Sequence, residues 1–276
     1  MATVRQQNLV RKKPVGLSPF SGDPFAVGLS QFYALNEGVG TTITDALGLV
    51  PLTISGSNPW SQIGSQLCLN LALNGQFAKA TVPTNARLGW PVSGAFGCRL
   101  LGSASANSRD FCVTFDNSTT TPFIAYGCNR TTLTPNLRWN SAGTFGQIAG
   151  TALTTGVDAV ISFTITSTKQ TLYQNGVATN TASNAISNPT FGAAPQMCIG
   201  EVQAEISNEI FYWGGIWQAN WTADMHAIIG QSIDSIWRIF QPFRGEWLFP
   251  NIASVGGPWP WFFDQSHSGG FSEMGL

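Results

Sequence analysis

The feature that most constrains the fold is a set of short segments in which apolar and polar residues alternate strictly. Residues 67–74, 111–116 and 157–166 each carry an apolar side chain at every second position. A period of two is typical of a β-strand with one buried face. The inward positions predicted in this way are Leu67, Leu69, Leu71, Leu73, Phe111, Val113, Phe115, Ile161, Phe163 and Ile165, with Ser162, Thr164 and Thr166 pointing outward.

Three further segments extend the all-β prediction. Residues 31–35 form a short aromatic run that predicts the first strand. Residues 171–179 contain Asn175-Gly176, a dipeptide that favours the two positive φ angles of a type I′ turn between paired strands. Residues 209–221 are apolar on both faces, which predicts a strand covered on both sides, either by the fold or by a tail. Turn residues separate the runs at a spacing typical of a sandwich or barrel.

One stretch, residues 223–240, follows helical spacing instead. Thr222 precedes it as a good N-cap, and Gly230 is predicted to interrupt or end the first helix. His226 is expected on an exposed or half-buried face of that helix. The apolar positions at helical spacing are Met225, Ile228, Ile229, Ile233, Ile236 and Trp237.

The two ends of the chain differ from this central region. Residues 1–30 lack periodicity and begin with a cationic segment without acids, so they are interpreted as a basic arm; a neighbouring chain clamps it, or it folds back on its own body. Residues 242–276 are rich in Pro and aromatic residues, which need a surface to lie on. Residues 31–241 would form the sandwich. The predicted assembly contacts are Arg5, Arg11, Lys12, Lys13, Trp259, Trp261, Phe262 and Phe263.

Composition excludes several classes of protein. Charged residues make up 10% of the chain against a typical ~25%, and the net charge of −1 argues against nucleic-acid binding. No run of about 20 apolar residues could span a membrane, and the first 20 residues lack the apolar core of a secretion signal. The five cysteines lack metal-ligand spacing; Cys112 and Cys128 could pair, but buried reduced thiols are the favoured interpretation.

Three pieces in order resemble the laminin-G-like branch of the concanavalin A-like lectin/glucanase superfamily. They are residues 32–48, residues 172–177, and residues 198–201 followed by 211–225. Residues 233–242 resemble the aromatic exit segment of phage-borne members. The resemblance implies an antiparallel jelly-roll β-sandwich, here with one short C-terminal helical segment and extended terminal arms. It also implies a place in bacteriophage particles, as a decoration, fibre or tail protein.

Candidate chemistry is sparse. Residues 201–205 resemble the acidic motif of the superfamily's glucanases, but Gln203 replaces its middle acid, and solvated turn acids at Glu201 and Glu205 are the favoured interpretation. Asp45 and Asp116-Asn117 could contribute to the calcium site that the resemblance implies, although exposed turn residues are the favoured interpretation. His226 and His267 have no partners at zinc-ligand spacing. No cofactor, metal site or enzymatic activity is therefore predicted.

Carbohydrate binding is the one positive hypothesis for a site, because sugars stack on exposed aromatic rings. The candidates lie near turn-rich stretches, and the alternative for each is a core or loop-packing role. They are Trp60, Trp90, Tyr126 and Trp139.

The sequence thus predicts a non-enzymatic structural component of a bacteriophage virion, made in the host cytoplasm, whose sandwich could contact glycans. Its expected partners are other virion proteins and copies of itself. A carbohydrate-binding adhesin acting in host-surface recognition is the alternative, and a glycoside hydrolase ranks third because the carboxylate pattern is broken.

Overall fold

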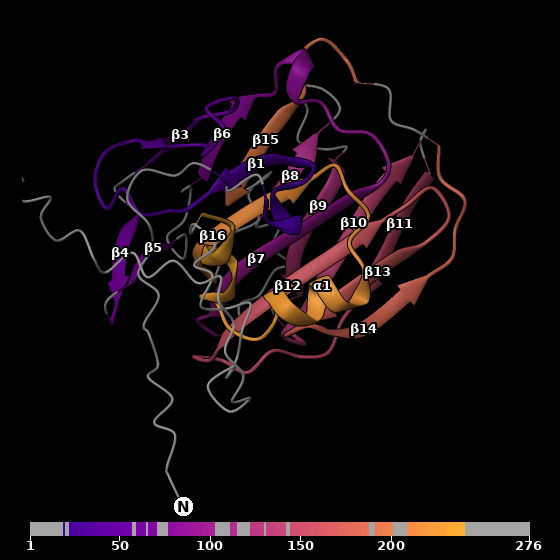
Figure 1. The fold of residues 1–276 in the computed structure, drawn as a ribbon. Helices are drawn as coiled ribbons and strands as arrows, with labels where there is room; N and C mark the ends of the chain where they lie inside the picture. The colour runs from indigo at the N-terminus through magenta and orange to yellow at the C-terminus, as the bar shows by residue number, and fades with distance from the viewer. Residues whose placement is uncertain are drawn as a thin grey trace, which may run out of the picture. The chain divides into compact units, whose positions relative to one another are not determined.

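Two antiparallel β-sheets make up most of the computed structural model (Figure 1). The structure describes residues 19, 22–56, 59–64, 66–70, 77–102, 111–114, 122–129, 131–141, 144–187, 191–200 and 209–240. Every strand pairing within these residues is antiparallel, as the alternating pattern predicts for sheets with one face on a core. The all-β prediction is confirmed.

The first sheet, sheet A, has the order β14-β13-β12-β7-β16-β5-β4, with β1 also beside β16. β16 is the centre of this sheet, because it pairs with β7 along one edge and with β5 and β1 along different parts of the other. The strands of sheet A are β1 Leu29–Tyr33, β4 Trp60–Ile63, β5 Gln66–Asn70, β7 Val92–Leu100, β12 Asp158–Ile165, β13 Gln170–Gln174, β14 Val177–Ala182 and β16 Glu209–Trp217.

The second sheet, sheet B, has the order β11-β10-β9-β8-β15-β6-β3-β2. Its strands are β2 Thr42–Ile43, β3 Leu52–Ser55, β6 Phe77–Thr81, β8 Phe111–Thr114, β9 Pro122–Asn129, β10 Thr134–Ser141, β11 Thr144–Ala149 and β15 Gln196–Gly200. The short helices are η1 Pro24–Ala26, η2 Thr84–Ala86, α1 Ala223–Ile229 and η3 Ser235–Phe240.

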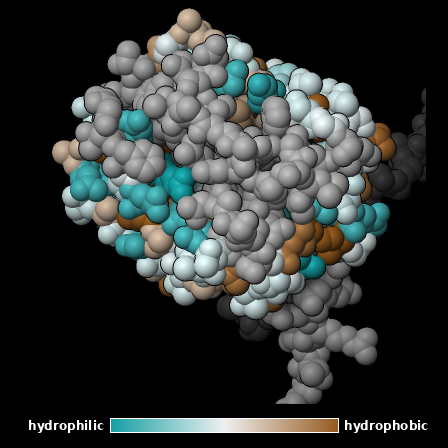
Figure 2. Space-filling view, turned by 180° about the vertical axis from the view of Figure 1, so that it is seen from behind, coloured by the Kyte–Doolittle hydropathy of each residue, from teal (hydrophilic) through white to brown (hydrophobic). Residues whose placement is uncertain are grey.

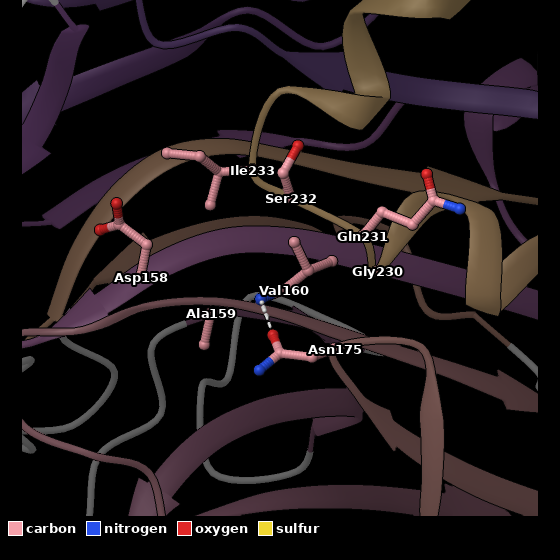
Figure 3. Close-up of a pocket in the computed structure, with 8 residues that line it drawn as sticks. All are labelled: Asp158, Ala159, Val160, Asn175, Gly230, Gln231, Ser232 and Ile233. Carbon is pink, nitrogen blue, oxygen red and sulfur yellow. Dashed lines mark hydrogen bonds between the residues drawn. The ribbon is translucent and has the colours of Figure 1, made fainter. Parts of the chain in front are cut away.

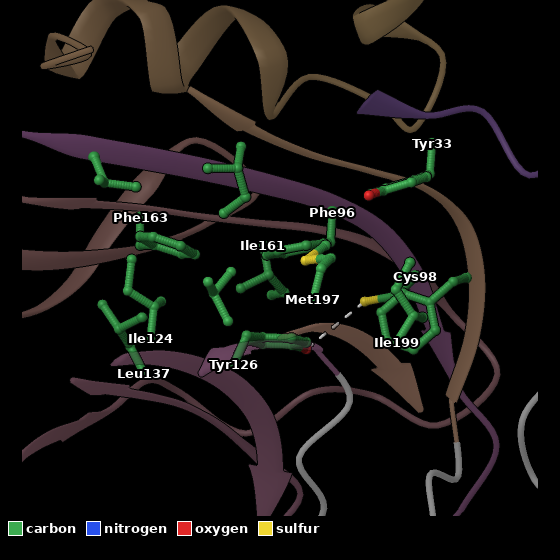
Figure 4. Packing of buried hydrophobic residues seen from close by; sticks show 14 of the residues in the cluster. Tyr33, Phe96, Cys98, Ile124, Tyr126, Leu137, Ile161, Phe163, Met197 and Ile199 are labelled. Carbon is green, nitrogen blue, oxygen red and sulfur yellow. Dashed lines mark hydrogen bonds between the residues drawn. The ribbon is translucent and has the colours of Figure 1, made fainter. Parts of the chain in front are cut away.

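The inner faces of the two sheets meet in a buried cluster, here called the interior cluster (Figure 4). Ile161, Phe163 and Ile165 of β12 all lie in it, so the predicted inward face of this strand is confirmed. Phe96 of sheet A stacks on Tyr126 of sheet B with ring centroids 5.3 Å apart. The labelled members in Figure 4 are Tyr33, Phe96, Cys98, Ile124, Tyr126, Leu137, Ile161, Phe163, Met197 and Ile199.

A second buried cluster, the outer cluster, covers the opposite face of sheet A. Trp213 and Trp217 project from β16 into it, while Phe211 and Ile216 of the same strand belong to the interior cluster. β16 is therefore buried at all its positions, as its apolar pattern predicts. The buried members of the outer cluster are Phe25, Phe32, Ala34, Cys68, Ala95, Val160, Ile210, Tyr212, Trp213, Trp217, Trp221, Ile229, Ile236, Trp237, Ile239 and Phe240.

The outer cluster corrects the predicted N-terminal boundary. Residues 22–30 were assigned to an extended arm, but Phe25 is buried and its carbonyl oxygen accepts a 2.6 Å hydrogen bond from Trp217 Nε1. Asp23 Oδ2 lies 3.1 Å from Arg238 Nε in an ion pair. This part of the chain thus folds back on its own body, and β1 begins at Leu29 rather than at residue 31. The predicted assembly residues at both ends of the chain lie outside the described residues.

The predicted hairpin is confirmed, and it also carries the helix. Asn175 and Gly176 have φ angles of 49° and 80°, as a type I′ turn requires. α1 begins after Thr222, whose Oγ1 accepts a hydrogen bond from Met225 N, and Gly230 follows its last residue. A Cβ added to Gly176 would lie 2.7 Å from the Cα of Ala227, so the helix backbone rests directly on the turn.

The described part of the surface is mixed in character. In the view from behind, hydrophilic side chains lie among small hydrophobic patches (Figure 2). Within the described residues, every helix falls short of the length and apolar character that a membrane crossing requires.

Candidate functional site

A polar groove opens on the outer face of sheet A, at the end of α1 where the helix begins. Its volume is about 550 Å³. β12, β13, the turn between them and the segment leading into α1 all contribute side chains. The lining residues are Thr164, Thr166, Thr168, Lys169, Thr171, Tyr173, Asn220, Trp221 and Ala223. We refer to it as the threonine groove.

The floor of the groove follows from strand alternation. Thr164 on β12 is paired with Thr171 on β13, and the next outward pair is Ser162 with Tyr173. Because directly opposed residues project to the same face, these hydroxyl-bearing side chains share the outer face of the sheet, while Phe163 points into the interior cluster. The outward direction predicted for Ser162 and Thr164 is therefore correct.

Lys169 is held at the groove by the tight turn between β12 and β13. Thr166 N donates to the Lys169 carbonyl oxygen over 2.8 Å, and Thr166 Oγ1 accepts from Lys169 N over 2.9 Å. Thr166 Oγ1 also lies 3.3 Å from Thr168 N. These bonds fix the backbone from which Lys169 extends, although the side chain itself is exposed.

His226 lies beneath the groove and corrects an expectation. The sequence placed it on an exposed or half-buried helix face, yet it is fully buried between α1 and sheet A. Its Nδ1 lies 2.8 Å from Ser162 Oγ and its Nε2 lies 2.8 Å from Thr164 Oγ1. Its ring stacks on that of Tyr173 with centroids 3.8 Å apart. One histidine thus supports groove residues from two strands.

Burial determines the charge state of this histidine. Removal from water lowers the pKa of His226 from 6.5 to about 3. The imidazole is therefore neutral at physiological pH, which suits its two hydroxyl partners, since a neutral ring donates through one nitrogen and accepts through the other.

Trp221 forms the apolar wall of the groove. Its ring packs edge-on against Phe25, with centroids 5.2 Å apart, and lies tilted against Trp217 at 4.5 Å, so it belongs to the outer cluster as well. Trp221 N donates to Ser93 Oγ over 3.1 Å. The indole Nε1 is buried and has no hydrogen-bond partner within the described residues. An unpaired buried donor costs about 1–3 kcal/mol.

A second hollow of about 470 Å³ lies at the other end of α1 (Figure 3). Asp158, the one acid among its described lining residues, accepts hydrogen bonds at Oδ1 from Arg99 Nε at 2.6 Å and from Tyr212 Oη at 2.7 Å. Burial and the hydrogen bond to Asp158 raise the pKa of Tyr212 well above its usual value. Asn175 Oδ1 accepts from Val160 N. Asp158 and the amide oxygen of Asn175 are thus already engaged in structural contacts.

The four aromatic residues that the sequence predicted as sugar-stacking platforms fall into two pairs, one buried and one half-buried. Tyr126 and Trp139 are 0% and 1% exposed in the interior cluster, so this prediction is wrong for both, and their core role holds instead. Trp60 and Trp90 are half-buried, and their Nε1 groups donate to the carbonyl oxygens of Gly40 and Ser187, respectively. Both rings pack against the interior cluster.

Asp45 does not fit the calcium ligand suggested by family resemblance. It is buried, and its carboxylate accepts hydrogen bonds from the backbone amides of Phe32, Leu47, Leu49 and Val50 at 3.0–3.2 Å. Asp45 thus organises the loop after β2. Within the described ranges, no group of three His, Cys, Asp or Glu residues is arranged to hold a metal ion. Asp116, Asn117, Glu201, Gln203, Glu205 and His267 lie outside the described residues.

Four cysteines follow the favoured interpretation of buried thiols. Cys128 is among them and forms no disulfide, so the alternative of a bridge from Cys112 to Cys128 is wrong. The buried cysteines that are thiols rather than half-cystines are Cys68, Cys98, Cys128 and Cys198.

Sequence reasoning missed the groove itself. The outward hydroxyls of residues 162–166 were recognised, but nothing in the chain's order indicated that Asn220 and Trp221 would close one side of them. The available signal was the polar run from Thr166 to Lys169, directly before a hairpin strand that carries an aromatic residue.

Comparison with known proteins supports the fold. No protein-family model and no curated protein sequence matches the chain. A solved structure of Trypanosoma rangeli sialidase in complex with 2,3-difluorosialic acid is similar, with a TM-score of 0.57 and 10% identity over 82% of this chain and 37% of that chain. The binding domain of botulinum neurotoxin serotype D/C is similar with a TM-score of 0.53 and 10% identity, over 74% of this chain and 51% of that chain. The chain thus spans about a third of the sialidase and half of the toxin domain.

Proposed function

We propose that this chain is a non-enzymatic structural component of a bacteriophage particle whose concanavalin A-like, laminin-G-like jelly-roll sandwich also binds glycans. The resemblance of residues 32–48, 172–177 and 211–225 to that superfamily supports the particle context. The threonine groove supports the glycan contact.

The distribution of carboxylates supports a binding rather than a hydrolytic role. Two-carboxylate glycosidases hold their acids about 5–9.5 Å apart across the scissile bond. Among the residues that the structure describes, no carboxylate lines the threonine groove, and Asp158, the acid that lines the second hollow, is engaged by Arg99 and Tyr212. The Tyr126 hydroxyl does lie 3.3 Å from Glu209, but both side chains are fully buried, so a sugar cannot reach them.

The observation that carries the glycan contact is the composition of the groove. Sugar sites combine an aromatic surface with polar groups that read hydroxyls. Tyr173 supplies a half-buried ring held in place by its stack on His226, and the remaining lining offers hydroxyls, one amide and one ammonium group. An open shape suits an extended chain that passes over the surface.

A glycan array with the full chain tests this contact, followed by titration calorimetry on the best ligand. We expect Tyr173→Ala to weaken binding at least about tenfold, a loss of about 1.4 kcal/mol. Trp60→Leu is the matched control, because it removes the half-buried aromatic at the far edge of sheet A. If Trp60→Leu abolishes binding while Tyr173→Ala leaves it intact, the groove is not the site.

The particle role has a separate test. Deletion of residues 1–20 removes Arg5, Arg11, Lys12 and Lys13 and leaves all strands of the sandwich intact. We expect the truncated chain to fold with unchanged circular dichroism and to be lost from purified particles in a complementation assay. Normal incorporation of the truncated chain would contradict the role assigned to the arm.

A further inference from the structure

We propose that the threonine groove selects glycans that carry carboxylate groups, and that Lys169 reads this negative charge. The inference rests on the proposed glycan binding and adds the chemical class of the ligand. Three observations support it: the hydrogen-bond donors of the lining, the ammonium group of Lys169, and the distance between Lys169 and the ring of Tyr173.

The lining of the groove supplies several hydrogen-bond donors. Burial raises the pKa of Tyr173 above its usual value, so its hydroxyl stays protonated at neutral pH, and no partner within the described residues engages it. The exposed side-chain amide of Asn220 offers two N–H donors beside one carbonyl acceptor, and the hydroxyls of the four lining threonines can each donate or accept. An ionised carboxylate accepts through two oxygens, so it can pair with several of these donors at once.

Lys169 is the one charged residue among the described residues that line the groove. Within the described residues its ammonium group makes no ion pair, since the two ion pairs join Arg99 to Asp158 and Arg238 to Asp23. Thr166 fixes the turn that carries it. A cation held on a rigid turn beside an open cavity attracts an anionic ligand, and no carboxylate among the described lining residues opposes that attraction.

The geometry of β13 sets the length of the ligand. Thr171 and Tyr173 lie at alternate positions of β13 and so share one face, and Lys169, in the turn just before this strand, lines the same groove. At about 3.3 Å per residue, the Cα atoms of Lys169 and Tyr173 lie roughly 13 Å apart. A sugar ring on Tyr173 and a carboxylate at Lys169 therefore belong to different units of an oligosaccharide, not to one monosaccharide.

The test compares an oligogalacturonate with its carboxyl-reduced neutral counterpart by calorimetry at about 50 mM and 500 mM salt. We expect the wild-type chain to prefer the acidic oligomer by about fivefold at low salt, and the preference to shrink at high salt as charges are screened. Lys169→Gln should remove the preference while neutral binding persists. Lys79→Gln, an exposed lysine on β6 of sheet B, is the matched control and should retain the preference.

The outcomes separate the two proposals. Equal binding of both oligomers by wild type and Lys169→Gln overturns the charge selection and leaves glycan binding intact. Loss of the preference in Lys79→Gln as well overturns it too, because a general charge effect would then explain it. Equal affinity for monomeric galacturonate or for polyglutamate shows a simple anion site and also overturns it. Absence of binding to every oligomer, in a wild-type chain with native circular dichroism, overturns the proposed glycan binding itself.

Discussion

The interior and outer clusters lie on opposite faces of sheet A and are built differently. The interior cluster is mainly aliphatic and forms where alternating positions of the two sheets meet. Half of the buried members of the outer cluster are aromatic, and they come from β1, β16, the segment between β16 and α1, and the short helices near both ends of the described chain. Large rings suit this task because a few short segments must cover a whole sheet face.

The difference shows where a binding site can arise on this fold. Sheet B covers the interior cluster completely. The outer cluster extends only as far as the short segments that cover the outer face of sheet A. Trp221 marks that limit, because its ring packs into the outer cluster while it also lines the threonine groove. The groove therefore lies at the edge of the outer cluster, where polar side chains of sheet A are not covered by further aromatic rings.

The largest expected effects test whether the two clusters fold as one unit. Phe163→Ala empties part of the interior cluster and Trp217→Ala part of the outer cluster, and each should lower the free energy of unfolding by about 3–5 kcal/mol. Because β16 contributes to both clusters, urea unfolding should remain a single transition when followed by far-UV circular dichroism and by tryptophan fluorescence. Two resolved transitions in Trp217→Ala would show that the outer layer unfolds on its own.

Acid should weaken the outer layer through His226. Folding lowers the pKa of this side chain from 6.5 to about 3, so the unfolded chain binds the proton more readily than the folded chain. The stabilising contribution is complete above pH 6.5 and is lost as the pH falls, at about 1.4 kcal/mol per pH unit.

Urea titrations between pH 6.5 and 4.5 measure this slope. The window lies above the usual pKa of Asp and Glu, which keeps most of their titration out of the comparison. His226→Gln is the control, since an amide can still pair with the hydroxyls of Ser162 and Thr164 but carries no titrating proton. If the free energy of unfolding changes equally with pH in the wild type and the variant, His226 is not the cause of the pH dependence.

A smaller effect is expected where α1 meets the hairpin. A Cβ on Gly230 would collide with the backbone of Asn175 and Gly176, so Gly230→Ala must shift the helix and should cost about 1–3 kcal/mol. Gly89→Ala is the matched control, because its added Cβ would meet only the Gln218 side chain at 3.7 Å. Thermal unfolding of both variants compares their midpoint temperatures. Equal midpoints would contradict the close contact between the end of α1 and the turn at Asn175 and Gly176.

The smallest effect on stability is expected at the groove. Lys169 is exposed and makes no ion pair within the described residues, so Lys169→Gln should change the free energy of unfolding by less than about 0.5 kcal/mol. A larger loss, measured by urea unfolding, would assign Lys169 a structural role and remove it as a clean probe of binding.

Local patterns predicted much of the fold. The alternation in residues 157–166 predicted both faces of β12, Asn175-Gly176 predicted the hairpin, and Thr222 with Gly230 predicted the limits of α1. Each of these signals depends on neighbouring residues alone, since backbone φ angles, caps and side-chain parity are local properties.

The candidate site could not be predicted in the same way. Tyr126 and Trp139 were predicted to be exposed sugar platforms, yet packing of the two sheets buries them. His226 was predicted to be exposed or half-buried, yet α1 packs on sheet A and brings its ring against Ser162 and Thr164. The sequence by itself determined which side chains share a strand face. Tertiary structure alone decided which faces are covered, because burial depends on contacts between segments such as Phe25 and Trp217 that lie far apart in the chain.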